Sequence, residues 1–325
     1  MSVAAFLASP HETSFSFEVL PPIKGNSIGQ IYRTVERLRE FCPAYVNITS
    51  HRSEVIYRQT GPDTYIRVEE RHRPGTVAIA AALKAKYGIT PVPHVICSGY
   101  TQQETEYELI DLAFLGITDL LVLRGDKGRG DPRFVARDGG LRHASELCAL
   151  VNRFNGGTLI DGNEHHMFDA EGGEGDAERF SYGVAGYPER HDEAHDDRTD
   201  LEMLRRKVEA GAGYVVTQMF FDNRRYFDFV ARCRSVGITV PIVPGIKPLS
   251  TLRHRTLLPQ TFHLTLPPEL DAELARCREG AEVKELGVEW AIAQCRELKA
   301  AGVPSIHFYS MNAADSIARI ARAVY

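Results

Sequence analysis

Short runs of β-branched and aromatic residues alternate with longer amphipathic segments along the whole chain. The runs predict strands at residues 15–19, 44–49, 90–97, 119–123, 182–186, 214–221, 240–245 and 305–309. The segments between them predict helices at residues 29–41, 76–87, 103–115, 141–154, 199–210, 225–236, 283–300 and 313–324. Several runs, such as Leu120–Leu123, are apolar on both faces, which is typical of parallel strands covered by helices.

Glycine recurs where a predicted helix gives way to the next strand, as at Gly116, Gly211, Gly237 and Gly302. A helix often ends in a left-handed residue, which glycine adopts without steric cost. Eight alternating strand–helix units with this punctuation favour a (β/α)8 TIM barrel over an open sheet. Such a barrel needs about 250 residues. We therefore expect one domain over residues 1–325.

Two segments interrupt the alternation. Residues 155–181 are rich in Gly, Asp, Glu and His, and we expect an inserted loop or hairpin before the fifth strand. Residues 250–278 contain Pro259, Pro267 and Pro268, which predicts an irregular crossover with a short helix.

Composition narrows the class of protein. The 38 basic and 43 acidic residues give a net charge of −5, which argues against a nucleic-acid or anionic-membrane surface. No apolar run approaches the roughly 20 residues that span a bilayer, and the first residues do not resemble a signal peptide. The 6 cysteines are scattered without a C-x-x-C pair, as in reduced thiols. We expect a cytoplasmic enzyme.

Polar side chains follow most of the predicted strands. In a parallel barrel, the carboxyl ends of the strands form the active-site face, so these residues are the natural candidates. They are Glu18, Asn47, Thr49, His94, Arg124, Asp126, Tyr187, Glu189, His191, Thr217, Gln218, His307, Tyr309 and Asn312, with Gly125 between Arg124 and Asp126. This convergence indicates an enzyme.

Simpler interpretations remain open for several of these residues. Glu18 has an ordinary explanation as a partner in a barrel ion pair, and His307 is better explained as a hydrogen-bonded core histidine. The cluster Met219–Phe221 fits either the core or a wall facing a ligand, and Phe220 is our candidate for that wall. His191 and His195 have metal-ligand spacing but no third ligand nearby, so we expect no metal.

Common catalytic and nucleotide-binding signatures are missing. The sequence has no G-x-G-x-x-G after the first strand, no G-x-x-x-x-G-K-[ST] and no G-x-S-x-G. Lys247 follows the seventh strand and is only a weak candidate for a Schiff-base lysine.

Taken together, the strand-end residues resemble those of the methylenetetrahydrofolate reductase family. The matching segments span nearly the whole chain in the family's order: Ser16–Pro22, Val92–Val95, Leu123–Asp126, Ala185–Glu189, Arg206–Ala212, Thr217–Asp222, Val243–Ile246 and His307–Tyr309. No single segment is diagnostic, but the eight in order are specific.

The resemblance implies FAD bound at the top of the barrel without a Rossmann fingerprint. It implies a ping-pong reaction in which NADH or NADPH reduces the flavin, which then reduces 5,10-methylenetetrahydrofolate to 5-methyltetrahydrofolate. By the same resemblance, Glu18 is the general acid that opens the methylene-bridged ring. Asp126 lies close to flavin and pterin, and Gln218, Tyr309 and Phe220 contact the substrate.

The resemblance also assigns flavin contacts. These are Thr49, His94, Arg124, Gly125, Asp126, Tyr187, His191, Asp200, Arg206 and Lys207. The sequence departs from the family pattern at Ser50, Met203 and Ala313 and in the 155–181 insertion. With no regulatory domain after Tyr325, the chain resembles the short, catalytic-domain-only form, and such barrels commonly form homo-oligomers.

Two other functions stay open from the sequence. One is a different FAD-dependent barrel enzyme, similar to proline dehydrogenase. The other is a folate- or flavin-binding module without catalysis. The residues leave the choice between NADH and NADPH open.

Overall fold

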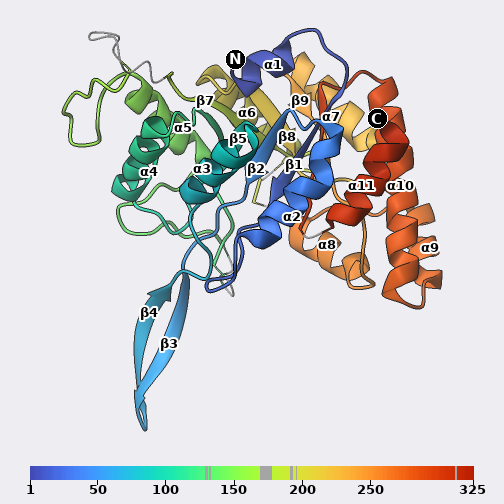
Figure 1. The fold of residues 1–325 in the computed structure, drawn as a ribbon, viewed down its shortest axis with the longest axis horizontal. Helices are drawn as coiled ribbons and strands as arrows, with labels where there is room; N and C mark the ends of the chain where they lie inside the picture. The colour runs from blue at the N-terminus through green and yellow to red at the C-terminus, as the bar shows by residue number, and fades with distance from the viewer. Residues whose placement is uncertain (129–130, 132, 169–177, 191–192, 195, 312) are drawn as a thin grey trace. The chain divides into compact units, whose positions relative to one another are not determined.

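The computed structural model describes residues 1–325 except 129–130, 132, 169–177, 191–192, 195 and 312. Its strands are β1 (Ser14–Val19), β2 (Tyr45–Ile48), β3 (Glu54–Gly61), β4 (Thr64–Glu70), β5 (Pro91–Ile96), β6 (Asp119–Leu123), β7 (Ser181–Gly186), β8 (Tyr214–Thr217), β9 (Ile242–Val243), β10 (Gly245–Ile246) and β11 (Ser305–Phe308). Figure 1 shows their order along the chain.

The α-helices alternate with these strands. They are α1 (Val3–Ala8), α2 (Gly29–Leu38), α3 (Thr76–Tyr87), α4 (Gln102–Phe114), α5 (Ala144–Asn155), α6 (Asp197–Glu209), α7 (Asn223–Ser235), α8 (His254–Phe262), α9 (Pro268–Arg276), α10 (Gly280–Ala300) and α11 (Ala314–Val324). A 3-10 turn, Arg39–Phe41, extends α2. None of the described helices is long and apolar enough to cross a membrane.

Across the described residues, the main sheet runs in the order β10, β11, β1, β2, β5, β6, β7, β8, β9. The two strands at its ends, β9 and β10, are successive pieces of one chain segment, separated only by Pro244. Proline has no N–H to donate, which explains the break in the ladder, while its carbonyl still accepts from the His307 N–H at 3.0 Å. The order is therefore that of a nearly closed (β/α)8 barrel, as predicted.

Contacts within the chain define two compact units. Unit 1 comprises residues 1–20, 32–47 and 181–325, and unit 2 comprises residues 21–31 and 48–180. The expectation of a single domain over residues 1–325 stays a prediction.

In unit 1, the two faces of β1 have different surroundings. The ring of Phe15 contacts Phe41 and Tyr325, which come from the helical side of the strand. Ser16, the next residue, contacts His307 Nδ1 at 3.0 Å. His307 also stacks on Tyr45 with ring centroids 6.2 Å apart, and both are buried. Ser16, Tyr45 and His307 thus fill the barrel interior, and the interpretation of His307 as a core histidine is confirmed.

Unit 2 contains an element that the sequence analysis missed, the antiparallel hairpin β3–β4. In Figure 1 it extends away from α3 and α4 of the same unit. Tyr57, Tyr65 and Ile66 on it are 69%, 58% and 46% exposed. The signals were present, because β-branched and aromatic residues, mixed with polar ones, lie on both sides of the turn residues Gly61-Pro62-Asp63.

Other boundaries need correction. The strand predicted at 214–221 ends at Thr217, and the crossover at 250–278 contains two helices, α8 and α9, rather than one. Helix α1 was not predicted. In the insertion at 155–181, the described part has an antiparallel bridge between Thr158 and Glu164, and residues 169–177 lie outside the described residues.

Candidate functional site

Three polar side chains of unit 1 form one row at the carboxyl ends of adjacent strands. Phe308 is in register with Phe17 of β1 and Ile246 of β10, and all three are fully buried. The next residue on each strand is Glu18, Tyr309 or Lys247. Because side chains alternate across a strand, this next row faces the barrel interior.

Glu18 combines burial with an uncommitted carboxyl group. The residue is 6% exposed, and its carboxyl makes no hydrogen bond or ion pair with any described residue. Its main-chain carbonyl instead accepts from the Ser310 hydroxyl, which fixes the backbone. Burial raises the pKa of Glu18 to about 8, against the opposing effect of the Lys247 ammonium. The ion-pair explanation of Glu18 therefore finds no partner for this carboxyl among the described residues, and a pKa of about 8 keeps the group largely protonated near neutral pH.

Tyr309 is held in place by the backbone around it. Its hydroxyl donates to the Thr217 carbonyl at 2.6 Å. A Cβ at Gly245 would lie 2.5 Å from the Tyr309 ring and 2.4 Å from the Thr217 carbonyl, so only glycine leaves room for this ring position. Burial, followed by the charge of Glu18, holds the pKa of Tyr309 well above its ordinary value.

Gln218 follows β8 directly and keeps part of its amide available. Its side-chain oxygen accepts from the Met219 N–H at 2.9 Å, while the NH2 group has no partner among the described residues. Phe220, two residues on, is 1% exposed and stacks on Tyr226 of α7 at 5.5 Å. A contact between Phe220 and substrate stays a prediction.

Unit 1 also holds several of the predicted flavin contacts. Arg206 and Lys207 lie in the last turn of α6. Lys207 donates to the carbonyl of Ala185 in β7 at 3.0 Å, so its ammonium lies near that strand's carboxyl end. Arg206 forms an ion pair with Glu202, with 3.3 Å between Nε and Oε1, and its side chain is largely exposed. Tyr187 follows β7, and Asp200 lies on α6; both are half-buried. His191 and His195 lie outside the described residues.

The strand-end residues of unit 2 form a second group. Ser98, after β5, donates to the Asp126 carbonyl at 2.6 Å, and its N–H donates to Arg124 O at 3.0 Å. Gly125 between them has φ +80°, where a side chain is strained, and its Cβ would lie 2.8 Å from Ser98. These two hydrogen bonds of Ser98 connect the residues that follow β5 to Arg124 and Asp126, which follow β6.

The other predicted residues of unit 2 lie on or after its strands. His94 is buried within β5. Thr49 contacts His51 Nε2 at 3.1 Å. Burial, then Arg73, lowers the pKa of His51, while Asp126 opposes the shift, which places the Asp126 charge near this imidazole. His51 was not among the predicted site residues.

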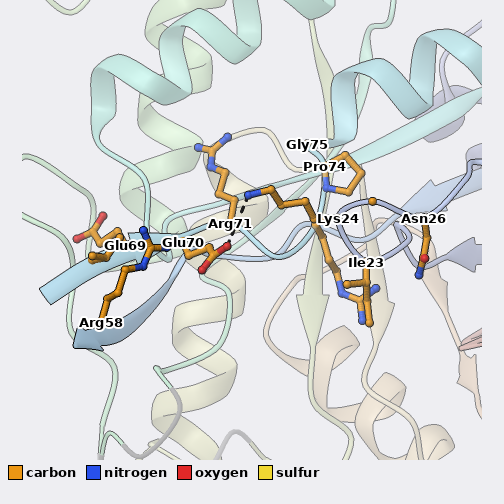
Figure 2. A pocket seen from close by; sticks show the side chains of 12 residues that line it. Ile23, Lys24, Asn26, Arg58, Glu69, Glu70, Arg71, Pro74 and Gly75 are labelled. Carbon is orange, nitrogen blue, oxygen red and sulfur yellow. Dashed lines mark ion pairs between the residues drawn. The ribbon is translucent and has the colours of Figure 1, made fainter. Parts of the chain in front are cut away.

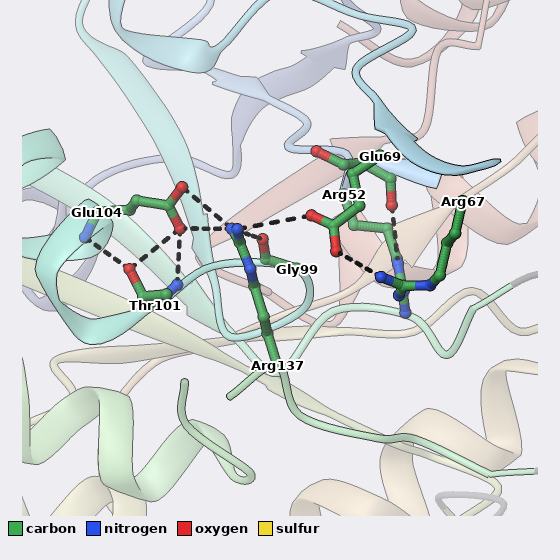
Figure 3. A network of polar contacts seen from close by, with 8 residues as sticks. Arg52, Arg67, Glu69, Gly99, Thr101, Glu104 and Arg137 are labelled. Carbon is green, nitrogen blue, oxygen red and sulfur yellow. Dashed lines mark hydrogen bonds and ion pairs between the residues drawn. The ribbon is translucent and has the colours of Figure 1, made fainter. Parts of the chain in front are cut away.

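A polar network surrounds Arg137, which follows β6 and precedes α5 in the chain. Arg137 binds Glu104 at 2.9 Å and Glu69 at 3.5 Å, as Figure 3 shows. Glu104 belongs to the first turn of α4, and Glu69 to β4. One guanidinium thus connects the segment between β6 and α5, a helix and the hairpin within unit 2.

A cavity of about 670 Å³ lies beside the base of the hairpin in unit 2. Lys24 and Glu70, two of the residues that line it, form an ion pair at 3.5 Å (Figure 2). None of the predicted site residues lines this cavity. Among the described residues, no group of three or more His, Cys, Asp or Glu side chains is arranged to hold a metal ion.

Comparison with protein families gives one match over nearly the whole chain. Residues 5–324 match the family model described as methylenetetrahydrofolate reductase. An Arabidopsis thaliana protein named methylenetetrahydrofolate reductase (NADH) 1 is 29% identical over 93% of this chain and 46% of its own length. The Escherichia coli 5,10-methylenetetrahydrofolate reductase is 28% identical over 94% of this chain and 88% of its own.

The relatives differ in how much of their length the chain spans. It spans about half of the plant relative (46%) and most of the bacterial one (88%). Among solved structures, a Clostridium thermocellum protein described as binding two copies of 5-methyl-5,6,7,8-tetrahydrofolic acid matches with a TM-score of 0.53. That match covers 96% of this chain and 95% of the other at 14% identity, which shows a common fold.

Proposed function

Because this chain belongs to the methylenetetrahydrofolate reductase family, we propose that it reduces 5,10-methylenetetrahydrofolate to 5-methyltetrahydrofolate with electrons from NADH or NADPH, carried by FAD in a ping-pong reaction. The observation that supports this most directly is Glu18, a strand-end carboxyl group that makes no hydrogen bond to the described residues and whose pKa is raised to about 8. A general acid works best when its pKa lies near the working pH.

The residues present fit a flavin dinucleotide. A diphosphate needs cations and N–H donors, and unit 1 offers the exposed guanidinium of Arg206 and the ammonium of Lys207 beside Ala185. Unit 2 offers polar groups on its own strand-end loops, including Thr49, Arg124 and Asp126. When bound, the flavin supplies a site that takes a hydride from the nicotinamide and later delivers it.

Glu18 performs the proton chemistry in this proposal. Its O–H gives a proton to one of the two nitrogens that the methylene group of the substrate bridges. The five-membered ring that contains this methylene group then opens, which leaves an iminium carbon that accepts hydride. Burial keeps Glu18 in the protonated form that this step requires.

The neighbouring residues bind and orient the substrate. The NH2 group of Gln218, which has no partner in the described part of the chain, suits a carbonyl on a pterin or nicotinamide ring. The ring of Tyr309, which packs against Gly245 and is held by the Thr217 carbonyl, lines the side of the proposed substrate site next to Glu18. Asp126 would accept hydrogen bonds from the pterin. We also keep a cytoplasmic location and a homo-oligomer as proposals.

Anaerobic stopped-flow kinetics of the purified protein tests the function and the role of Glu18 separately. Protein with a flavin spectrum should be bleached by NADH or NADPH and reoxidised by methylenetetrahydrofolate. In Glu18→Gln, we expect bleaching at a normal rate and folate reduction slowed by about 10²–10⁴-fold. Glu289→Gln, an exposed position on α10, is the control.

Two results would contradict the proposal in different ways. A colourless protein that gains no absorbance from added FAD would exclude the flavin reaction. Unchanged folate reduction in Glu18→Gln would leave the reaction in place but remove Glu18 as the acid.

A further inference from the structure

Lys247 is a buried lysine whose burial no structural ion pair explains. It follows β10 directly, and the residue is 6% exposed. Its Nζ donates to Met311 Sδ at 3.2 Å, a weak acceptor. No carboxylate oxygen of a described residue lies within the 4.0 Å of an ion pair with Nζ. Burying an ammonium group costs free energy, because the group loses its hydration, unless a nearby group of opposite charge offsets that loss.

Glu18 lies in the same row as Lys247, two strands away, with Tyr309 between them. The register of β10, β11 and β1 puts Lys247, Tyr309 and Glu18 side by side on the inner face. Within the described part of the chain, the Glu18 carboxyl has no hydrogen-bond partner and the Lys247 ammonium has only the Met311 sulfur, so the two groups influence one another through the low-dielectric interior. Each is the charge that opposes the effect of burial on the other's pKa.

Among the described residues, His254 and Tyr309 respond to the charges of this pair, and both are neutral near pH 7. His254 of α8 has its pKa lowered to about 4 by burial and then by Lys247, and its Nδ1 accepts from the Ser250 N–H at 3.2 Å. Tyr309 keeps its proton because burial and Glu18 raise its pKa, with smaller effects from Tyr187 and Tyr45. Lys247 is therefore the cation that acts on Glu18 among the described residues.

We propose that Lys247 is a positioning residue of the folate half-reaction, whose ammonium stabilises the Glu18 carboxylate that remains once the proton has passed to substrate. This inference rests on the proposed function. In the step, the O–H bond of Glu18 breaks and its electron pair stays on the carboxylate. An N–H bond forms on one of the two nitrogens that the methylene group bridges. The bond from that nitrogen to the methylene carbon breaks, and its electron pair stays on the nitrogen. The carboxylate regains a proton from water before the next turnover.

The energetic reason is the cost of a buried carboxylate. Burial alone makes Glu18 a poor proton donor, because the charge left behind has no solvent to stabilise it. A nearby cation lowers the pKa of a carboxyl by about 1–3 units. Lys247 thus keeps Glu18 acidic enough to give up its proton, while burial keeps it protonated beforehand.

The test measures the titration of Glu18 directly. Protein as purified, labelled with [5-¹³C]glutamate, is titrated by NMR, and the signal lost in Glu18→Gln identifies the carboxyl. In Lys247→Met we expect the pKa of Glu18 to rise by about one unit or more. We expect folate reduction at neutral pH to slow about tenfold or more, with the nicotinamide half-reaction changed less than about twofold. Lys284→Met, on α10, should leave both unchanged.

The outcomes separate this inference from the function that it rests on. Lys247→Gln replaces the methionine variant if that protein does not fold, and Lys247→Arg, which keeps the charge, should hold the pKa of Glu18 near the wild-type value. A folded Lys247→Met or Lys247→Gln protein with an unshifted Glu18 titration would overturn the role of Lys247. Unchanged folate reduction in Glu18→Gln would instead contradict the proposed acid, without altering the titration result.

Discussion

At the scale of single residues, the side chains of the site owe their properties to their neighbours. Glu18 is one of 43 acidic residues, and nothing in its sequence neighbourhood reveals a pKa of about 8. The pKa shift results from burial of Glu18 in the barrel interior. The register of β10, β11 and β1 places Glu18 there in one row with Tyr309 and Lys247. The strand-end position of Glu18 was predictable from the apolar run before it, whereas the relation between Glu18 and Lys247 was not, because the two residues lie 229 positions apart in the sequence.

The raised pKa of Glu18 predicts how stability depends on pH. The pKa is about 8 in the folded protein, against an ordinary value of 4.5 that we take for the unfolded chain. Between these values the folded state holds one more proton, so stability should fall as pH rises, by up to about 1.4 kcal/mol per pH unit from this group. Lys247, whose pKa burial lowers, acts in the opposite sense at higher pH.

Urea unfolding of the wild type and Glu18→Gln from pH 5 to pH 8 isolates this contribution. The difference in unfolding free energy between the two proteins should change steadily with pH, in favour of the glutamine variant at the alkaline end. A difference that stays constant across the range would show that Glu18 titrates normally in the folded protein.

At the scale of elements, the hydrophobic pattern predicted the eight barrel strands and their helices closely. It worked because each strand is covered by helices and each helix has one buried face. It failed where elements have less apolar surface to bury. The hairpin β3–β4 is largely exposed, and the break between β9 and β10 depends on Pro244 in a run that otherwise looks continuous.

The start of α4 offers a test at this scale. Thr101 caps the helix, because its hydroxyl accepts from the Glu104 N–H at 3.1 Å while Glu104 accepts from the Thr101 N–H at 2.8 Å. Arg137 binds the same carboxylate. We expect Thr101→Ala to lower the unfolding free energy by about 1 kcal/mol, as the loss of a helix cap usually does.

Chemical denaturation monitored by circular dichroism measures the effect, with Thr101→Ser as the control that keeps the hydroxyl. If the alanine variant is as stable as the serine variant, the capping interaction does not contribute to stability. Flavin binding, measured on the same proteins, would show whether the loop after β6 depends on this cap.

At the scale of the whole molecule, the sequence predicted the barrel, its family and the group of strand ends that carry the candidate site. The division into two compact units was not foreseen, because it depends on the density of contacts rather than on any sequence pattern. The assignment of cofactor contacts rests on the resemblance to the family, since apolar periodicity contains no information about a ligand.

The cysteines give a test that samples the entire chain. All 6 are free thiols: Cys97, Cys148, Cys233 and Cys295 are buried, Cys277 is half-buried and Cys42 is exposed. A thiol-reactive chromogenic reagent should label Cys42 rapidly and Cys277 more slowly, and the other four only after unfolding. Cys42→Ser should abolish the fast phase.

The melting temperature completes this test, because a chain without disulfides should melt at the same temperature with and without a reducing agent. Rapid labelling of four or more thiols in the native protein would contradict the packing of the barrel described above.

The exposed β3–β4 hairpin has a practical consequence. Its turn at Gly61-Pro62-Asp63 joins two strands that, among the described strands, pair with one another and not with the main sheet, and those strands bury little surface. Exposed turns of this kind accept inserted sequence with little loss of stability. A short epitope or a fluorophore-binding peptide placed between Pro62 and Asp63 would give a handle for immobilising or imaging the protein that leaves both chain termini unmodified.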